Sequence, residues 1–281
     1  MVGSATLNRR VFGVYLPLAL FLVFLLFPFY WMAIVSFKPT DDLFKLQYNP
    51  FWIQHFTLEN YQYLFAETDF VSWFKNTMIV AMASTSISLF CSVLIGYALA
   101  RLRFPGSSFL GVGIFLAYLV PPTLLFIPMA QVIATFNLFN TYWALILTYP
   151  THLIPFASWM LMGYFRTIPK EIEESALIDG SSRLGSLVRI ILPLALPGVL
   201  SAGIFSFTLS WNEFLYALIF MSSGPMKTLP VGTVSDLIKA DVLFWGSLMA
   251  SAILGSVPVA FIYSFFVDQY VSGLTAGAVK G

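Results

Sequence analysis

The sequence predicts an all-α polytopic membrane protein with six transmembrane helices. Hydrophobic residues make up 59% of the chain and charged residues only 10%, whereas soluble proteins carry roughly 25% charged residues. The mean hydropathy is +0.85. Aromatic residues reach 17%, which suits a lipid-facing surface with interfacial belts. The net charge of +1 argues against a nucleic-acid partner.

The expected helices follow from the length of the apolar segments, because a helix needs about 20 such residues to cross a bilayer. Six segments qualify: residues 12–36, 77–100, 109–134, 142–165, 195–221 and 245–268. The first is longer than the apolar core of a signal peptide, so we expect it to remain as a span. Pro121-Pro122 in the third span, and Pro150 and Pro155 in the fourth, predict broken or bent helices.

Positive charge sets the expected orientation, since cytoplasmic loops carry an excess of Lys and Arg. One side of the membrane would hold nine of these residues: Arg9, Arg10, Arg101, Arg103, Arg166, Lys170, Arg183, Arg189 and Lys280. The other would hold five: Lys38, Lys45, Lys75, Lys227 and Lys239. We therefore expect a multi-pass protein of the cell (inner) membrane, in contact with membrane lipid, with both termini cytoplasmic. Residues 37–76 and 222–244 would lie outside, the former with a short interfacial helix or cap.

A polar segment between the fourth and fifth spans stands out against this background. Residues 169–174 carry one Lys and three Glu. Pro169 suits the first turn of a helix, and Thr167 is a candidate N-cap. Gly180 lies where a helix would close with a left-handed residue. We therefore expect a helix over 169–179 and a second, short helix from about Ser182 to Ile190.

The first of these helices has features of a docking surface. Ala176 and Gly180 are four residues apart and share a face on which a partner could approach closely. Glu174 offers a carboxylate to a basic partner. The alternative is a surface helix that lies on the membrane without a partner.

Polar residues inside the fifth span form a second candidate site. Glu213 is the ionisable residue placed deepest in a span, where a charge costs at least about 2.5 kcal/mol and should face the bundle interior or water. Trp211 and Asn212 beside it add an aromatic face and an amide, which suit a hydroxyl-rich ligand on a substrate path. The alternative is a structural hydrogen bond that fixes helix packing. For His152 we favour a packing or hydrogen-bonding role.

Several chemistries find no support in the sequence. None of the seven lysines follows a glycine, so there is no phosphate-binding G-K-[ST] loop for ATP hydrolysis. Two histidines and the single Cys91, expected to be a small buried hydrophobe, predict neither a metal site nor a disulfide. No G-x-S-x-G elbow is present. We therefore expect neither an enzyme nor a bound metal or cofactor in this chain.

The polar segment resembles the EAA loop of type I ABC-importer permeases, which reads E-A-A, three residues, G, nine residues, I-x-L-P. The matching residues are Glu174, Ala176, Gly180, Ile190, Leu192 and Pro193. Ser175 replaces the first Ala, a small-for-small change. Residues 273–281 resemble the tail of maltose-permease MalG-type subunits, and Trp211–Phe214 resembles the fifth-helix signature of carbohydrate permeases.

The resemblance implies a five-helix type I permease core over residues 72–268, with coupling helices at about 169–191. Residues 1–71 would add an N-terminal helix and an outer segment, and 269–281 a cytoplasmic tail that reaches the ATPase. Residues 222–244 would form the scoop loop, which enters the binding protein. The residues that would dock on the ATPase are Glu174, Ser175, Ala176, Asp179 and Gly180.

In that family a permease subunit works by alternating access, driven by a separate ATPase. The resemblance implies a second permease subunit, an ATPase subunit dimer that holds ATP and Mg, and an extracytoplasmic sugar-binding protein as partners. The solute would be a sugar or sugar derivative. Two alternatives remain: a permease of the same family for a non-sugar solute, and a secondary transporter, which should show intramembrane acidic pairs or unwound helices in repeated halves.

Overall fold

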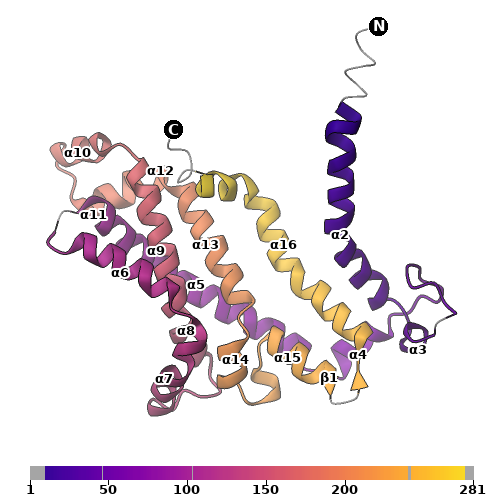
Figure 1. Ribbon diagram of the computed structural model, residues 1–281. Coiled ribbons are helices and arrows are strands. Elements are labelled where there is room, and N and C mark those ends of the chain that lie inside the picture. The colour runs from indigo at the N-terminus through magenta and orange to yellow at the C-terminus, as the bar shows by residue number, and fades with distance from the viewer. Residues whose placement is uncertain (1–9, 46, 103, 240–241, 276–281) are drawn as a thin grey trace, which may run out of the picture. The chain divides into compact units, whose positions relative to one another are not determined.

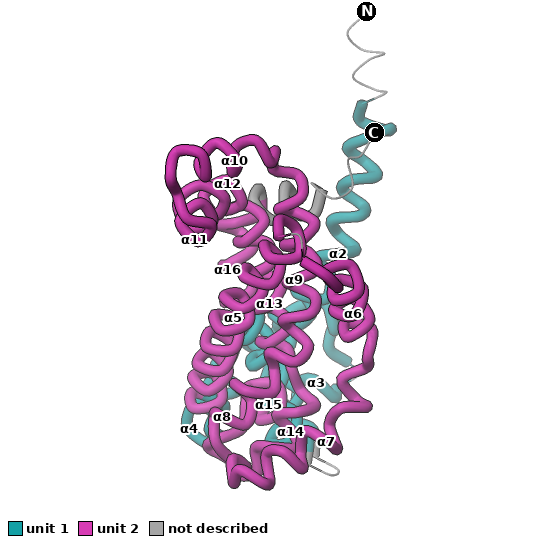
Figure 2. The backbone as a smooth tube through the Cα atoms, turned by 90° about the vertical axis from the view of Figure 1, so that its left-hand side faces the viewer, with its two compact units in different colours: residues 1–70, 233–256 teal, residues 71–232, 257–281 magenta. Residues whose placement is uncertain are grey.

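The computed structural model describes residues 10–45, 47–102, 104–239 and 242–275 (Figure 1). The chain forms two compact units, shown in Figure 2. Unit 1 comprises residues 1–70 and 233–256, and unit 2 comprises 71–232 and 257–281. Among the described residues, nearly all regular structure is helical, as the composition predicts, apart from the two-residue strands β1 (Ile238–Lys239) and β2 (Val242–Leu243).

In the described part of the chain, four continuous helical segments are long and apolar enough to cross a membrane: Val11–Ser36, Phe70–Arg101, Tyr142–Thr167 and Trp245–Val267. They correspond to the π-helical turn η1 (Val11–Tyr15) with α2 (Leu16–Ser36), α5 (Phe70–Arg101), α8 (Tyr142–Thr148) with α9 (Pro150–Thr167), and part of α16 (Trp245–Thr275). Two sharply bent helix pairs bring the number of candidate spans to six if each pair is one span. Helix α16 has a kink at Phe266 (φ −120°, ψ 18°), close to the expected start of the tail at residue 269, and helical residues continue beyond it to Thr275. Residues 276–281 of the expected tail lie outside the described part.

The third predicted span is broken at its proline pair, as expected. Helices α6 (Ser107–Leu119) and α7 (Pro122–Thr135) meet at 94°. Val120 and Pro121 between them have extended backbones, with ψ of 119° and 130°. Each precedes a proline, and the proline ring disfavours a helical conformation in the residue before it.

The fourth predicted span is not broken, contrary to expectation. Tyr149, between α8 and α9, keeps helical dihedral angles (φ −59°, ψ −39°). Pro150 is the first residue of α9, where its missing N–H removes little. Pro155 lies within α9, and Tyr142–Thr167 still forms one 26-residue segment.

The fifth predicted span, 195–221, is wrong as a single helix. Helix α12 (Leu192–Leu194) ends at Ala195, and α13 (Leu196–Trp211) starts there after a bend of 81° from the segment Arg183–Leu194. A second break at residues 212–214 separates α13 from α14 (Leu215–Phe220). Hydrophobicity predicts the apolar length but not the break at residues 212–214, where the side chains of Asn212 and Glu213 bond to the backbone.

Unit 2 is elongated, and its short helices lie at two opposite ends. Helix α10 (Lys170–Ile178) and α12 are at one end, and α7 and α14 are at the other, in both Figure 1 and Figure 2. Close packing joins α5 to α9, because a Cβ added at Gly96 would come within 3.0 Å of Leu161 and of the Met162 backbone. Buried hydroxyls of Ser84 and Ser210 lie 2.9 Å apart and link α5 to α13.

The start of α5 holds part of the second predicted outer segment. This part comprises the 3-10 turn η3 (Gly224–Met226) and the beginning of α15 (Leu229–Leu237). Trp73 Nε1 donates to the Gly224 carbonyl at 2.9 Å. Asn76 Nδ2 donates to the carbonyls of Pro225 and Lys227, both at 2.8 Å. Buried side-chain donors therefore fix an irregular segment that has no ladder of its own.

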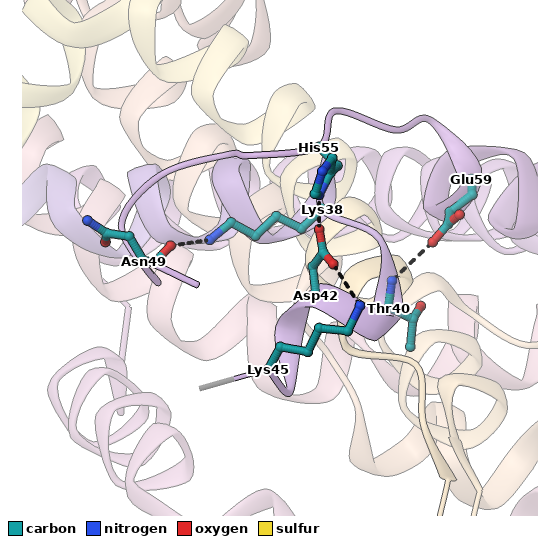
Figure 3. Close-up of polar contacts among 7 residues, drawn as sticks. All are labelled: Lys38, Thr40, Asp42, Lys45, Asn49, His55 and Glu59. Carbon is teal, nitrogen blue, oxygen red and sulfur yellow. Dashed lines mark hydrogen bonds and ion pairs between the residues drawn. The ribbon is translucent and has the colours of Figure 1, made fainter. Parts of the chain in front are cut away.

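Unit 1 contains most of the first predicted outer segment, which forms α3 (Thr40–Leu43) and α4 (Glu59–Ala66) joined by a loop. The prediction that this segment extends to residue 76 is wrong, because α5 begins at Phe70. The Lys38 ammonium is buried against this loop and donates to the Pro50 carbonyl at 2.7 Å. Its burial lowers the pKa of Lys38. Asp42 accepts from His55 Nδ1 at 2.7 Å and from Lys45 at 3.4 Å (Figure 3).

These contacts make the loop acid-sensitive. The hydrogen bond from His55 lowers the pKa of Asp42 below 3.8. A carboxyl with a depressed pKa in the folded state stabilises that state above its unfolded pKa, and the contribution is lost as the pH falls through the folded pKa.

We expect the Asp42 carboxyl to titrate below its usual pKa in wild type and at a higher pH in His55→Ala, where the hydrogen bond from the imidazole is lost. The titration would be measured by carbon-13 NMR of Asp-labelled protein. Asp42→Asn identifies the signal, and an unchanged midpoint in His55→Ala would contradict the assignment.

Candidate docking helix and membrane path

Helix α10 begins and ends close to where the sequence predicts. Pro169 precedes its first residue, and Glu171 and Glu173 lie in the first turn, where carboxylates favour the positive end of the helix. Gly180 has φ +88° and closes the helix as expected. The amides of Gly180 and Ser181 donate to the carbonyls of Leu177 and Ala176, at 3.2 and 2.9 Å, which is the Schellman pattern.

The predicted N-cap of this helix is wrong. The Thr167 hydroxyl donates to the Tyr164 carbonyl at 2.8 Å, within α9. No side chain caps α10, whose N-cap residue is Pro169. Thr167 is the last residue of α9, so its hydroxyl bonds back along its own helix, a common competing arrangement for Thr.

The second predicted helix runs four residues further than expected. Ser182 caps it by accepting from the Gly185 amide at 3.0 Å. The helix then runs through α11 (Arg183–Ser186), the π-helical turn η2 (Leu187–Ile191) and α12. Pro193 lies in the first turn of α12, where a proline does not stop a helix.

The residues expected to dock on a partner do not share one exposed face. Glu174, Ser175, Asp179 and Gly180 are exposed, while Ala176 is only 7% exposed. Ser175 Oγ donates to the Glu171 carbonyl at 2.8 Å. Ala176 thus packs inside this chain, where its small side chain lets α10 lie close to its neighbours.

An apolar residue that we did not predict stands out on the exposed side of α10. Ile178 is 86% exposed, although it is one turn from Glu174 and lies in a polar segment. Leu184 on the following helix is 63% exposed. Large apolar side chains held in water beside a carboxylate indicate a surface that a partner covers. In the sequence, the only sign of this exposed apolar surface was an isoleucine within a charged helix.

The inner side of α10 is held by a charged contact that sequence reasoning also missed. Glu173 ion-pairs with Arg101 at the end of α5, with Oε2 and Nε 3.6 Å apart. Tyr97 Oη donates to Glu173 Oε1 at 2.5 Å. Arg101 Nη2 donates to the Ile168 carbonyl at 2.6 Å. We call these residues, Tyr97, Arg101, Ile168 and Glu173, the α10 anchor.

Burial makes the two charged groups of the α10 anchor depend on each other. The side chains of Arg101 and Glu173 are 2% and 6% exposed. Two charges removed from water need each other and further hydrogen bonds, because an unpaired buried charge costs several kcal/mol. The anchor therefore fixes which face of α10 points inward and leaves Glu174 outside.

The residues expected on the substrate path have separate local roles. Trp211 is buried, with its ring 5.6 Å from Phe207 and 5.5 Å from Phe74. Asn212 is exposed, and its Nδ2 donates to the Thr208 carbonyl at 2.9 Å. Trp211 thus packs within the bundle, and the amide of Asn212 closes the end of α13.

Glu213 lies two residues before the next helix, α14, and bonds to its first turn. Its two carboxylate oxygens accept from the amides of Tyr216 and Ala217, at 2.9 and 3.2 Å, in the first turn of α14. A carboxylate at this place satisfies amides that have no partner inside the helix. These contacts cap the first turn of α14 where the predicted fifth span is interrupted, and the substrate-path role of Glu213 stays a prediction.

His152 lies beside Glu213's helix, among aromatic rings. Its ring is 5.8 Å from Tyr149 and 6.2 Å from Tyr216. Tyr216 Oη donates to the Pro122 carbonyl at 3.1 Å, where the third span breaks. Within the described residues, no three His, Cys, Asp or Glu side chains gather in a way that would hold a metal ion.

The first prediction from these contacts concerns the α10 anchor. Replacing Glu173 by Gln removes the charge that Arg101 needs, so we expect a loss of about 3 kcal/mol of stability. The free energy of unfolding of the purified chain would be measured by denaturant titration in detergent. Glu171→Gln, an exposed change on the same helix, is the matched control. Equal stability of the two variants would contradict a buried ion pair.

The second prediction concerns the cap of α14. Glu213→Ala leaves two amides without an acceptor, so we expect a loss of about 1 kcal/mol, as for other lost caps. Glu213→Gln keeps one acceptor oxygen and should lose less. The same unfolding measurement compares both variants. If Gln and Ala were equally harmless, the contacts with Tyr216 and Ala217 would not stabilise the helix.

This chain is similar in sequence to known components of membrane transport systems. A family profile described as a binding-protein-dependent transport system inner membrane component matches residues 92–275. The chain is 39% identical over 282 residues to the inner membrane ABC transporter permease protein YcjP of Escherichia coli (strain K12), with 99% of each chain covered. It is 34% identical over 258 residues to the trehalose/maltose transport system permease protein MalG of Thermococcus litoralis, covering 91% of this chain and 92% of that protein.

The fold agrees with these sequence matches. A crystal structure of a bacterial ABC transporter involved in the import of the acidic polysaccharide alginate contains a chain of similar fold, with a TM-score of 0.78 and 19% identity. The similarity covers 94% of this chain and 97% of that one. The profile match and the near-complete alignment with ABC permeases confirm the resemblance carried by the EAA loop: this chain belongs to the binding-protein-dependent transport system inner membrane component family.

Proposed function

We propose that this chain is one of the two permease subunits of an ATP-driven importer for a sugar or sugar derivative. Its similarity to a trehalose/maltose permease supports a carbohydrate as the solute. The proposed partners are a second permease subunit, an ATPase subunit dimer and an extracytoplasmic sugar-binding protein. ATP and Mg bind to the ATPase, and this chain binds no cofactor of its own. Both termini are cytoplasmic in this assembly.

The observation that carries the proposal is the two-sided character of α10. Its outer side presents Glu174 and the 86% exposed Ile178 to water. Its inner side is fixed to α5 through Glu173 and Arg101. In the proposed mechanism the outer side docks on the ATPase, and movement of α10 on ATP binding passes directly to the span that the anchor holds. Alternating access follows from that movement.

The docking role makes a specific prediction. In Glu174→Arg a positive charge meets a basic partner, and like charges at an interface cost several kcal/mol, so ATPase association should weaken more than about tenfold. Binding of the ATPase subunit to the complex would be measured by co-purification and by sugar-stimulated ATP hydrolysis. Glu171→Arg, at another exposed position of α10, is the control. Wild-type association and transport in Glu174→Arg would refute the docking role.

The solute is tested separately from the docking. The tagged chain is purified in mild detergent with its partners, which are identified by mass spectrometry, and the recovered binding protein is screened against sugars, amino acids and metal ions. Binding of a sugar supports the proposal. Binding of a different solute keeps the permease but overturns the sugar, and recovery of the chain without an ATPase overturns both.

A further inference from the structure

Two adjoining cavities flank the N-terminus of α6 in unit 2. Both are lined by Leu99 and Ser107, and their volumes are ≈ 390 Å³ and ≈ 350 Å³. Lys170, the first residue of α10, lines the smaller one. The cavities therefore lie at the α10 end of the unit.

Three basic side chains line the two cavities. Arg101 and Lys170 line the smaller cavity, and Arg166 lines the larger one. No carboxylate lines either cavity in the part of the chain that the structure describes. Glu173 neutralises part of the Arg101 charge through its ion pair with Nε. An anion placed between these cations would be held by charge-assisted hydrogen bonds.

The helix end adds backbone donors. The N-cap residue of α6 is Gly106, with φ +87°, and no side chain caps the helix. The first amides of a helix have no partner within it, and they favour an anion. The amide of Ser107 already donates to the Phe104 carbonyl at 3.2 Å, so the donors for an anion would be the amides that follow it. Ser107 and Ser108 carry hydroxyls at the same position, and both line the larger cavity.

A buried donor provides independent evidence for a missing acceptor. Nη1 of Arg101 is buried and has no hydrogen-bond partner, although Nη2 of the same group donates to the Ile168 carbonyl. The side chain is 2% exposed and lines the smaller cavity. Buried polar groups are nearly always hydrogen-bonded, but Nε and Nη1 of this guanidinium, whose side chain lines the smaller cavity, have no hydrogen-bond acceptor within the described part of the chain.

The larger cavity continues into an apolar wall between α6 and α9. Val112, Phe115, Trp159 and Met162 form this wall. The rings of Phe115 and Trp159 are 5.5 Å apart, and the Trp159 side chain is exposed. Tryptophan is enriched where membrane helices meet the headgroup region. A free phosphate gains nothing from contact with these apolar side chains, whereas an acyl chain would pack against them.

We propose that the two cavities bind an anionic phospholipid. Its phosphate lies at the N-terminus of α6 between Arg101, Arg166 and Lys170, and one acyl chain runs along Phe115 and Trp159. Basic pockets between membrane helices bind such headgroups in other proteins. Because Arg101 belongs to the α10 anchor, the bound lipid would also stabilise the position of α10. The proposal does not depend on which solute is transported.

The test uses the full chain in nanodiscs that contain phosphatidylglycerol and phosphatidylcholine, with retained lipid counted by native mass spectrometry. The double variant Arg166→Gln, Lys170→Gln should retain phosphatidylglycerol about 30-fold more weakly, at roughly one surface cation's attraction per residue. The control pair Arg183→Gln, Arg189→Gln removes two exposed arginines outside the cavities and should retain it like wild type. Equal retention in the two pairs would overturn the proposal.

A second variant separates a lipid from a free anion. Gly111 has room for a side chain, since an added Cβ would come 3.8 Å from Met162 Sδ. Gly111→Leu fills the apolar part of the larger cavity and leaves every charge in place, so it should reduce phosphatidylglycerol retention. Inorganic phosphate serves as the competing probe. If it displaces the lipid at millimolar concentration from wild type, and Gly111→Leu retains lipid normally, the site takes a free anion and the lipid assignment is wrong.

Discussion

The buried contact among Tyr97, Arg101 and Glu173 is the interaction on which the polar end of this protein depends. It joins the end of a 32-residue apolar helix to a short charged one. A buried ion pair alone adds little stability, since desolvation offsets the attraction of the two charges. Here the tyrosine hydroxyl and the Ile168 carbonyl provide additional hydrogen bonds. The contact specifies a position for α10 more than it adds stability.

This position gives neighbouring glutamates opposite roles. Consecutive residues of a helix point about 100° apart, so fixing Glu173 against Arg101 turns Glu174 towards water. The same rotation buries Ala176 and exposes Ile178. A helix held rigidly on one side and open on the other is suited to pass a movement from a docked subunit to a membrane span.

At two of the breaks in the predicted spans, polar side chains bond to backbone groups at the helix ends. Asn212 bonds to the carbonyl of Thr208, and Glu213 accepts from the amides of α14. Tyr216 bonds to the Pro122 carbonyl at the other broken span. Within a membrane-spanning bundle, unsatisfied backbone groups cost several kcal/mol each, so irregular backbone persists only where side chains provide partners.

The sequence by itself determined the class of protein, the approximate place of each apolar segment and the two helices around Gly180, because hydrophobicity, proline and left-handed glycine act locally. It also predicted the break at Pro121-Pro122. Only the tertiary structure decided that α13 ends at Trp211, that Ala176 faces inward and that Glu173 pairs with Arg101. The last two outcomes depend on contacts between residues far apart in the chain, such as Tyr97 and Glu173, 76 residues apart, whereas the end of α13 coincides with the local contacts of Asn212 and Glu213. Periodicity and propensity carry no information about such pairs.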